Sequence, residues 1–179
     1  MLSMQHLILI GPMGAGKTTV GRKLARLTER RFVDADHEIE RRAGVDIPYI
    51  FEREGEAGFR PRERQVIQEL CADHDNYPQG LVLATGGGAV LDADSRRLMR
   101  ENGTVIYLQA RAETLYQRTK QSAHRPLLQV ANPLAKIEEI LAAREALYIE
   151  TAHLCINTEA MPLKHLANWL ADELQQGHI

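Results

Sequence analysis

The residues with the most specific chemistry lie near the start of the chain, in the stretch GPMGAGKT at positions 11–18. This stretch has the pattern G-x-x-x-x-G-K-[ST], which joins a strand to a helix and cradles phosphate groups. Glycine is needed there because a side chain would obstruct both the backbone angles and the close approach of a ligand. The backbone N–H groups of such a loop, at the start of a helix, converge on phosphate oxygens. We therefore predict a binding site for a nucleoside triphosphate and magnesium.

Two side chains at the end of this loop can contact the phosphates and a metal ion. The Lys17 ammonium can reach the β- and γ-phosphates, and the Thr18 hydroxyl can ligate Mg²⁺. The alternative is a glycine-rich turn between a strand and a helix that binds nothing. The predicted nucleotide-binding residues of the loop are Gly14, Ala15, Gly16, Lys17, Thr18 and Thr19.

Two acidic residues follow a second apolar stretch, in the sequence FVDAD at positions 32–36. In an open α/β sheet, ligands bind beyond the carboxyl ends of the strands. Asp34 and Asp36 share a face if the chain stays extended, so one could hold magnesium and the other could accept a proton from an attacking hydroxyl. The alternative is a polar strand end at which Asp36 caps a helix that starts at His37.

Three consecutive glycines, Gly86, Gly87 and Gly88, follow a third apolar stretch. Many phosphate-loop proteins have an acidic residue at this point, so its absence here favours Asp34 as the magnesium carboxylate. Because no side chains stand in the way, a small polar substrate could lie against backbone N–H groups. The alternative is a flexible turn that leads into a helix.

Three arginines lie in separate segments that could meet around one ligand: Arg60, Arg125 and Arg144. Each taken alone is most simply a solvated surface side chain. Together with Asp36 and the glycines, they could form a pocket for an anionic, hydroxylated small molecule. A guanidinium on a mobile flap could also stabilise charge on a transferring phosphoryl group.

Short apolar stretches alternate along the chain with amphipathic ones, which predicts a three-layer α/β fold with a parallel sheet. Segments 36–63 and 120–132 interrupt this alternation, and we expect them to form a substrate-binding region and a lid rather than ordinary surface loops. The expected strands are 6–10, 31–34, 81–85, 104–108 and 153–157. The expected helices are 17–27, 63–73, 92–101, 113–120, 133–150 and 163–175.

Length and composition predict one domain of 179 residues with a net charge of −2, which gives no sign of wholesale nucleic-acid or membrane binding. Cys71 and Cys155 fit no zinc or redox spacing, which is typical of a reducing compartment. The first residues resemble a strand rather than a signal peptide, and no apolar stretch is long enough to span a membrane. We therefore expect a cytoplasmic protein, and a monomer, since no apolar stripe is left over once the helices pack.

Taken together, these motifs make the chain similar to the shikimate kinases, over roughly residues 7 to 155. The phosphate loop occurs in many families, but a D-x-D, an F-R-x-x-E and a T-G-G-G in this order do not. The matching stretches, in order, are GPMGAGKTTVGRKLA, FVDADHEIE, IFEREGEAGFRPRE, LATGGGAV, RPLL and REALYIETA.

The resemblance implies a nucleoside-monophosphate-kinase type of fold with a central five-stranded parallel sheet. It implies transfer of a phosphoryl group from ATP to shikimate, giving ADP and shikimate 3-phosphate, a step toward chorismate and the aromatic amino acids. Asp36 would then be the general base, and Asp34 would join Thr18 in the magnesium shell. Lys17 would contact the ATP phosphates.

The resemblance also assigns the remaining site residues. Arg60 and Arg144 would bind the shikimate carboxylate, Gly86 to Gly88 would line its ring, Arg125 would close from the lid onto the phosphates, and Arg118 would lie near the adenine. Segment 158–162 should also contact adenine, but no single residue there stands out. Pro48 is unusual for this family, although the first turn of a helix tolerates it.

Three other functions share some of these sequence features. A gluconate kinase would also suit two arginines and a carboxylate, but the F-R-x-x-E and T-G-G-G pair argues against it. A nucleoside monophosphate kinase would need a base-reading pocket after the second strand, which is not evident. A non-catalytic nucleotide-binding module would usually lack Lys17 or Asp36, both of which are present.

Overall fold

Five parallel strands form the centre of the molecule in the order β2-β3-β1-β4-β5. The computed structural model describes residues 5–121 and 128–179. The strands are β1 (His6–Ile10), β2 (Arg31–Asp34), β3 (Leu81–Ala84), β4 (Gly103–Gln109) and β5 (Leu154–Asn157). Every residue of β1 and β3 is buried, as expected of strands covered on both faces. The prediction of a five-stranded parallel sheet is confirmed.

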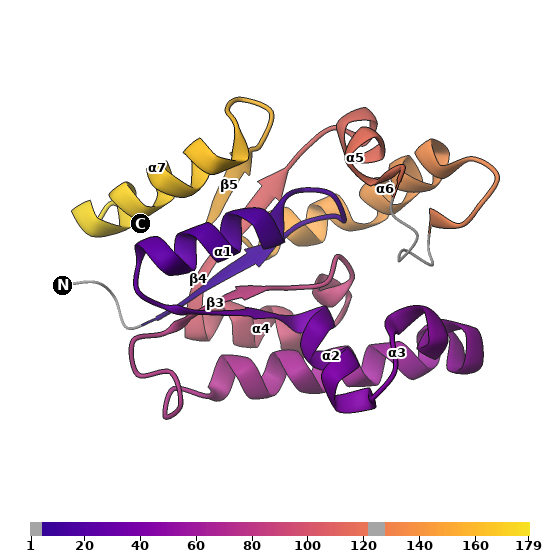
Figure 1. The fold of residues 1–179 in the computed structure, drawn as a ribbon, viewed down its shortest axis with the longest axis horizontal. Coiled ribbons are helices and arrows are strands. Elements are labelled where there is room, and N and C mark those ends of the chain that lie inside the picture. The colour runs from indigo at the N-terminus through magenta and orange to yellow at the C-terminus, as the bar shows by residue number, and fades with distance from the viewer. Residues whose placement is uncertain (1–4, 122–127) are drawn as a thin grey trace.

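Helices cover both faces of the sheet, which confirms the three-layer α/β prediction. Figure 1 shows α1 and α7 above the strands and α3 and α4 below them. The helices are α1 (Lys17–Leu27), α2 (Ala35–Ala43), α3 (Ile47–Ala72), α4 (Ala93–Asn102), α5 (Ala112–Thr119), α6 (Pro133–Thr151) and α7 (Leu163–Gln176), with a short 3-10 turn η1 (Ala89–Leu91). None of the helices among the described residues is long and apolar enough to cross a membrane.

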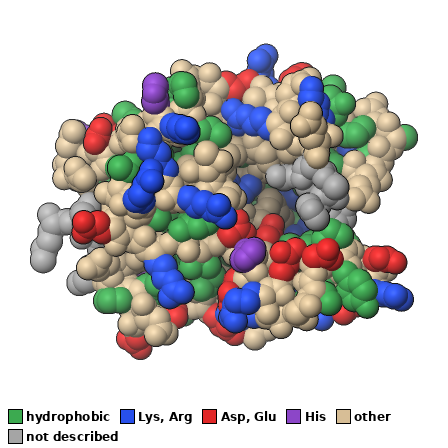
Figure 2. Space-filling view, in the orientation of Figure 1, with side chains coloured by type: hydrophobic (Ala, Val, Ile, Leu, Met, Phe, Trp, Pro, Cys, Tyr) green, Lys and Arg blue, Asp and Glu red, His purple; other side chains and the backbone are tan. Residues whose placement is uncertain are grey.

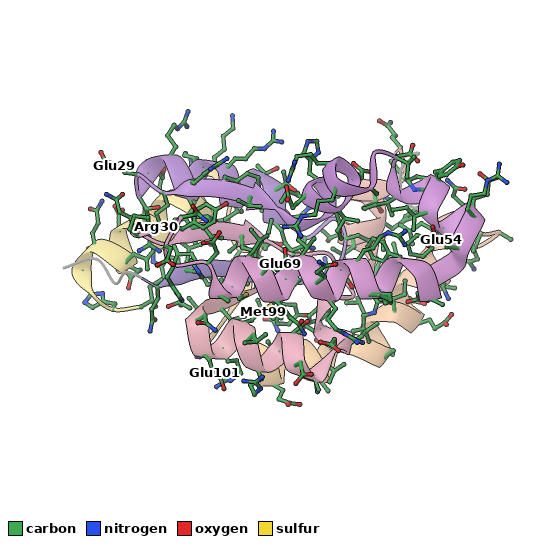
Figure 3. All side chains as sticks on the ribbon, turned by 90° about the horizontal axis from the view of Figure 1, so that it is seen from below. Glu29, Arg30, Glu54, Glu69, Met99 and Glu101 are labelled. Carbon is green, nitrogen blue, oxygen red and sulfur yellow. The ribbon has the colours of Figure 1, made fainter. Side chains whose placement is uncertain are left out.

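Alternate side chains of β1 enter two different apolar cores, which fixes the sheet between the two helical layers. Leu7 and Leu9 join the core shared with α1 and α7, whereas Ile8 and Ile10 join the core shared with α3 and α4. Seen from below, α3 and α4 lie side by side over the second core, which Met99 enters from α4 (Figure 3). Packing on both faces fixes the carboxyl ends of the strands. The loops that carry the predicted site residues start from these ends.

The region between the second and third strands is largely helical, which corrects the expected helix at 63–73. The α2 helix begins directly after β2, and α3 begins at Ile47 and continues to Ala72. The Asp46 side chain caps α3 by accepting a hydrogen bond from the Tyr49 N–H, and Pro48 lies in the first turn. At Gly55 the backbone leaves helical geometry (φ 67°) and α3 kinks there. Several glycines and prolines made this segment look irregular, but side-chain capping and packing against the second core outweigh them.

Candidate functional site

The loop between β1 and α1 has the backbone angles for which glycine was predicted to be needed. Gly11, Gly14 and Gly16 have φ values of 144°, 81° and 100°, a region that other residues rarely adopt. A Cβ at Gly14 would also come within 2.6 Å of Thr119 Cγ2 on α5. The α1 helix begins at Lys17, so the loop opens onto a helix N-terminus, where backbone N–H groups attract anions.

The Lys17 side chain folds back over this loop. Its ammonium donates hydrogen bonds to the Gly11 carbonyl at 2.6 Å and the Pro12 carbonyl at 2.8 Å. These bonds hold the positive charge at the mouth of the loop, and a bound phosphate could take their place because it is a charged acceptor.

Thr18 and Asp34 place two oxygen atoms side by side. The Thr18 hydroxyl donates to Asp34 Oδ2 at 3.0 Å, while Asp34 Oδ1 accepts the backbone N–H groups of Asp36 at 3.0 Å and His37 at 3.2 Å. Asp34, rather than Asp36, therefore caps α2, which corrects the alternative given above. A hydroxyl and a carboxylate oxygen fit Mg²⁺, which typically takes one or two protein ligands and otherwise water and phosphate. No cluster of three His, Cys, Asp or Glu side chains suited to a metal ion occurs within 5–121 and 128–179.

The surroundings of the Asp36 carboxyl group disfavour its negatively charged form. Burial, and then the neighbouring carboxylates of Glu63 and Asp34, raise its pKa from 3.8 to about 7, against the lowering effect of Lys17. Its Oδ1 atom is buried and has no hydrogen-bond partner among the described residues. A carboxyl group with a pKa near 7 and a free oxygen is suited to accept a proton at neutral pH.

Glu63 is a site residue that the sequence interpretation missed. It is 3% exposed, and its Oε1 atom accepts a hydrogen bond from Arg60 Nη1 at 2.7 Å. Its Oε2 atom is buried without a partner in the described part of the chain. Burial raises the pKa of Glu63, against the opposing charges of Arg60 and then Arg144. The i,i+3 spacing in F-R-x-x-E was the signal, because it places Arg60 and Glu63 on one face of a helix.

The glycines after β3 are needed because charged side chains lie directly against two of them. A Cβ at Gly86 would lie 2.6 Å from Glu63 Oε2 and 2.8 Å from Asp36 Oδ1. A Cβ at Gly88 would fall on the Arg60 guanidinium, 2.5 Å from its central carbon. At Gly86 and Gly88, the protein's own side chains therefore occupy the space next to the backbone that was predicted for a substrate.

Gly87, between the two, has more open space. A Cβ there would meet no atom closer than 3.5 Å, and its carbonyl accepts a hydrogen bond from the Tyr148 hydroxyl at 2.5 Å. Tyr148 is fully buried and stacks on Tyr107 with ring centres 4.9 Å apart. Tyr148 therefore fixes the glycine segment in place, a role that the sequence did not reveal.

Arg60 and Arg144 approach the same carboxylate from different helices. Arg60, on α3, also donates to Glu56 Oε1 from Nε at 2.9 Å and from Nη2 at 2.6 Å. Arg144, on α6, is 7% exposed and close enough to lower the pKa of Glu63. Two guanidinium groups that act on the same carboxylate, one buried and one partly buried, could together bind a carboxylate ligand.

Most of the predicted site residues surround one cavity of about 360 Å³ at the carboxyl ends of the strands. Figure 2 shows this face hollowed, with acidic side chains along the lower rim. Ala15 is buried beneath the loop, Arg60 and Gly88 line a neighbouring cavity together with Glu63, and Arg125 lies outside the described residues. The predicted residues that line the larger cavity are Gly14, Gly16, Lys17, Thr18, Thr19, Asp34, Asp36, Gly86, Gly87 and Arg118.

Replacing Glu63 by Gln should shift the pH dependence of any reaction in which Asp36 accepts a proton. Removing one negative neighbour lowers the pKa of Asp36, so the acidic limb of the rate profile moves to lower pH by about half a unit or more. The measurement is kcat as a function of pH, from about pH 5 to about pH 9. Glu54→Gln is the matched control, because Glu54 pairs with the exposed Arg62 outside the cavity. An unshifted profile would show that Glu63 does not act on Asp36.

Comparison with known proteins finds similarity to shikimate kinases over nearly the whole chain. The family model described as shikimate kinase matches residues 13–175. A shikimate kinase of Ralstonia nicotianae is 51% identical over 99% of this chain and 91% of its own length. One from Bordetella pertussis is 52% identical over 94% of this chain and 78% of its own. The solved structure of a shikimate kinase from Acinetobacter baumannii in complex with shikimate is 46% identical, covers 98% of this chain and 96% of its own, and superposes with a TM-score of 0.91.

Proposed function

Because the chain belongs to the shikimate kinase family, we propose that it transfers the γ-phosphoryl group of ATP to a hydroxyl group of shikimate, giving ADP and shikimate 3-phosphate in aromatic amino-acid (chorismate) biosynthesis. The observation that carries the proposal is the placement of Asp36. Its carboxyl group, with a pKa near 7 and an unpartnered oxygen among the described residues, lies in the same cavity as the phosphate-binding loop. A cavity that brings both groups together and excludes water would favour transfer to the acceptor hydroxyl over hydrolysis of ATP.

The nucleotide would bind through the loop between β1 and α1. Backbone N–H groups from Gly14 to Thr19 would hold the phosphates, and the Lys17 ammonium would leave the Gly11 and Pro12 carbonyls to contact them. Asp36 would accept the proton of the attacking hydroxyl as that oxygen approaches the γ-phosphorus in line. Arg125, outside the described residues, is proposed to neutralise charge on the transferring group from a lid at about 120–132.

Thr18 and Asp34 would hold Mg²⁺, and their paired oxygen atoms support this. When bound, the ion neutralises charge on the β- and γ-phosphates. Asp34 already fixes the start of α2 through two backbone hydrogen bonds, so its position does not depend on the ligand. The carboxylate is thereby kept in place before the nucleotide arrives.

The acceptor would lie between the glycine segment and the two arginines. Arg60 and Arg144 would bind its carboxylate. Gly86 to Gly88 would line its ring, with Gly87 closest because it has the most open space. Since Arg60 is held by Glu56 and Glu63, the guanidinium is oriented before the acceptor binds. We propose a substrate-binding region at about 36–63, from α2 and the first part of α3.

We also propose that residues 1–179 form a single kinase domain that acts as a cytoplasmic monomer and binds neither nucleic acid nor membrane. The net charge of −2 and two cysteines that form no disulfide support this setting. Exposed large apolar side chains such as Leu27, Leu91 and Trp169 form no continuous stripe along one helix, which supports a monomer. Light scattering of the purified protein would test its mass in solution.

The decisive experiment is ADP production by the purified protein with ATP and Mg²⁺, measured with shikimate, with gluconate and with no acceptor. We expect strong stimulation by shikimate alone. Stimulation by gluconate instead would assign a different acceptor to the same fold. Absence of any stimulation, with ATP still bound, would point to a non-catalytic nucleotide-binding protein.

A further inference from the structure

Thr158, directly after β5, connects two loops that meet at the nucleotide cavity. The residue is 1% exposed, and its hydroxyl donates to the Gln109 carbonyl at 3.0 Å. The same hydroxyl accepts a hydrogen bond from Arg118 Nη1 at 3.1 Å. This buried hydroxyl therefore acts as both donor and acceptor, which fixes its orientation.

Arg118 Nη1 also reaches the phosphate-binding loop. It lies 3.2 Å from the Gly14 carbonyl and 3.4 Å from the Ala15 carbonyl, and it donates to both. Arg118 side-chain atoms line the same cavity as Lys17. These two carbonyls and the Thr158 hydroxyl are all neutral acceptors, and Thr158 provides the one that belongs to a side chain.

Glu159, the next residue, attaches the loop to the first turn of α5. Its carboxylate accepts the Arg111 backbone N–H at 3.0 Å, the Arg111 Nε–H at 3.2 Å and the Thr114 hydroxyl. These hydrogen bonds lower the pKa of Glu159, with the Thr114 hydroxyl contributing most. The loop after β5 is therefore joined to α5 at both ends of the helix, by Glu159 at its start and by Thr158 near its end.

We propose that Thr158 is a positioning residue for the nucleotide: its hydroxyl holds Arg118 between the phosphate-binding loop and the loop after β5, while Glu159 holds that second loop on α5. The proposal rests on the proposed function, because it takes Arg118 to contact the bound nucleotide. Thr158 itself is buried and acts only through the guanidinium. Removing its hydroxyl should weaken nucleotide binding and leave the transfer step unaffected.

The test compares the dissociation constant of MgADP, measured by calorimetry, for wild type, Thr158→Val, Thr158→Ser, Arg118→Ala and the double variant Arg118→Ala with Thr158→Val. Valine keeps the shape and loses the hydroxyl, so we expect binding about three- to tenfold weaker, whereas serine keeps the wild-type value. In steady-state assays with shikimate, KM for ATP should rise by the same factor at unchanged kcat. The double variant should bind no more weakly than Arg118→Ala alone, because Thr158 acts through Arg118.

Thr28→Val is the matched control, since Thr28 is also buried and its hydroxyl also bonds a carbonyl, that of Leu24, at the far end of α1. It should match wild type in MgADP binding. If Thr158→Val does not fold, Glu159→Gln provides the second variant and should weaken MgADP binding about twofold or more. Wild-type affinity for MgADP in Thr158→Val would overturn the proposal. So would a double variant in which the effects of Arg118→Ala and Thr158→Val on MgADP binding simply add. A wild type that binds MgADP without responding to shikimate would count against the proposed function only.

Discussion

Replacing Asp36 by Asn should lower kcat for phosphoryl transfer to shikimate by about a thousandfold or more while MgADP still binds. The asparagine side chain has nearly the same shape but cannot accept the proton of the attacking hydroxyl. The side chain that accepts the hydrogen bonds capping α2 is that of Asp34, so the substitution leaves this helix start intact. The measurement is kcat in an ADP-production assay, with calorimetry of MgADP binding on the same preparation.

The same substitution should stabilise the fold at alkaline pH. The pKa of Asp36 is raised from 3.8 to about 7, so the folded protein holds this proton more tightly than the unfolded chain does. The contribution of Asp36 to the stability of the wild type therefore falls as pH rises between these two values, and it stays low above about pH 7, where the buried carboxylate is charged. The asparagine of the Asp36→Asn variant cannot ionise, so the variant should gain on the order of 4 kcal/mol at about pH 8 and little at about pH 4.

Urea unfolding of both proteins at about pH 4 and about pH 8 measures this difference. Asp75→Asn provides the control, because Asp75 is exposed in the loop before β3 and should change neither activity nor the pH dependence of stability. A variant that keeps more than about a tenth of the wild-type kcat would show that another group accepts the proton. A gain in stability that is equal at both pH values would show that ionising the Asp36 carboxyl group costs the fold nothing.

Short-range sequence signals were sufficient for the sheet and for most of the helices. All five predicted strands match the structure to within a single residue at each end, because each is a short, largely apolar stretch bounded by turn residues. The α3 helix was predicted too short because its first half contains Gly55 and Gly58, and one of these does break the helix. What keeps that half helical is its contact with the second core, which is long-range information.

The site residues, too, divide into those that local sequence fixes and those that depend on long-range contacts. The positions of Lys17, Thr18 and Asp34 could be predicted because a loop motif and a strand end fix them locally. Glu63 and Tyr148 could not, because their importance comes from contacts with the glycine segment, which the chain brings near only on folding. The role of Thr158 could not be predicted for the same reason, because its partner Arg118 is 40 positions away in the sequence.

Replacing Gly88 by Ala should raise KM for shikimate by about ten- to a hundredfold with little change in KM for ATP. The backbone at Gly88 has φ −97° and ψ 3°, angles that alanine accepts, so the substitution itself adds no strain. The added methyl group instead falls on the Arg60 guanidinium, which must leave Glu63 Oε1 and the place where it would bind the acceptor carboxylate. Steady-state kinetics with each substrate varied in turn separates the two KM values.

The effect of Gly88→Ala should disappear when Arg60 is already absent. In an Arg60→Ala background there is no guanidinium to displace, so the double variant should have the KM for shikimate of Arg60→Ala alone. Additive effects would mean that the methyl group blocks the acceptor directly. An unchanged KM in the single variant would mean that Arg60 binds the acceptor from another position. The three glycines would then serve the approach of Asp36 and Glu63 at Gly86 rather than that of Arg60 at Gly88.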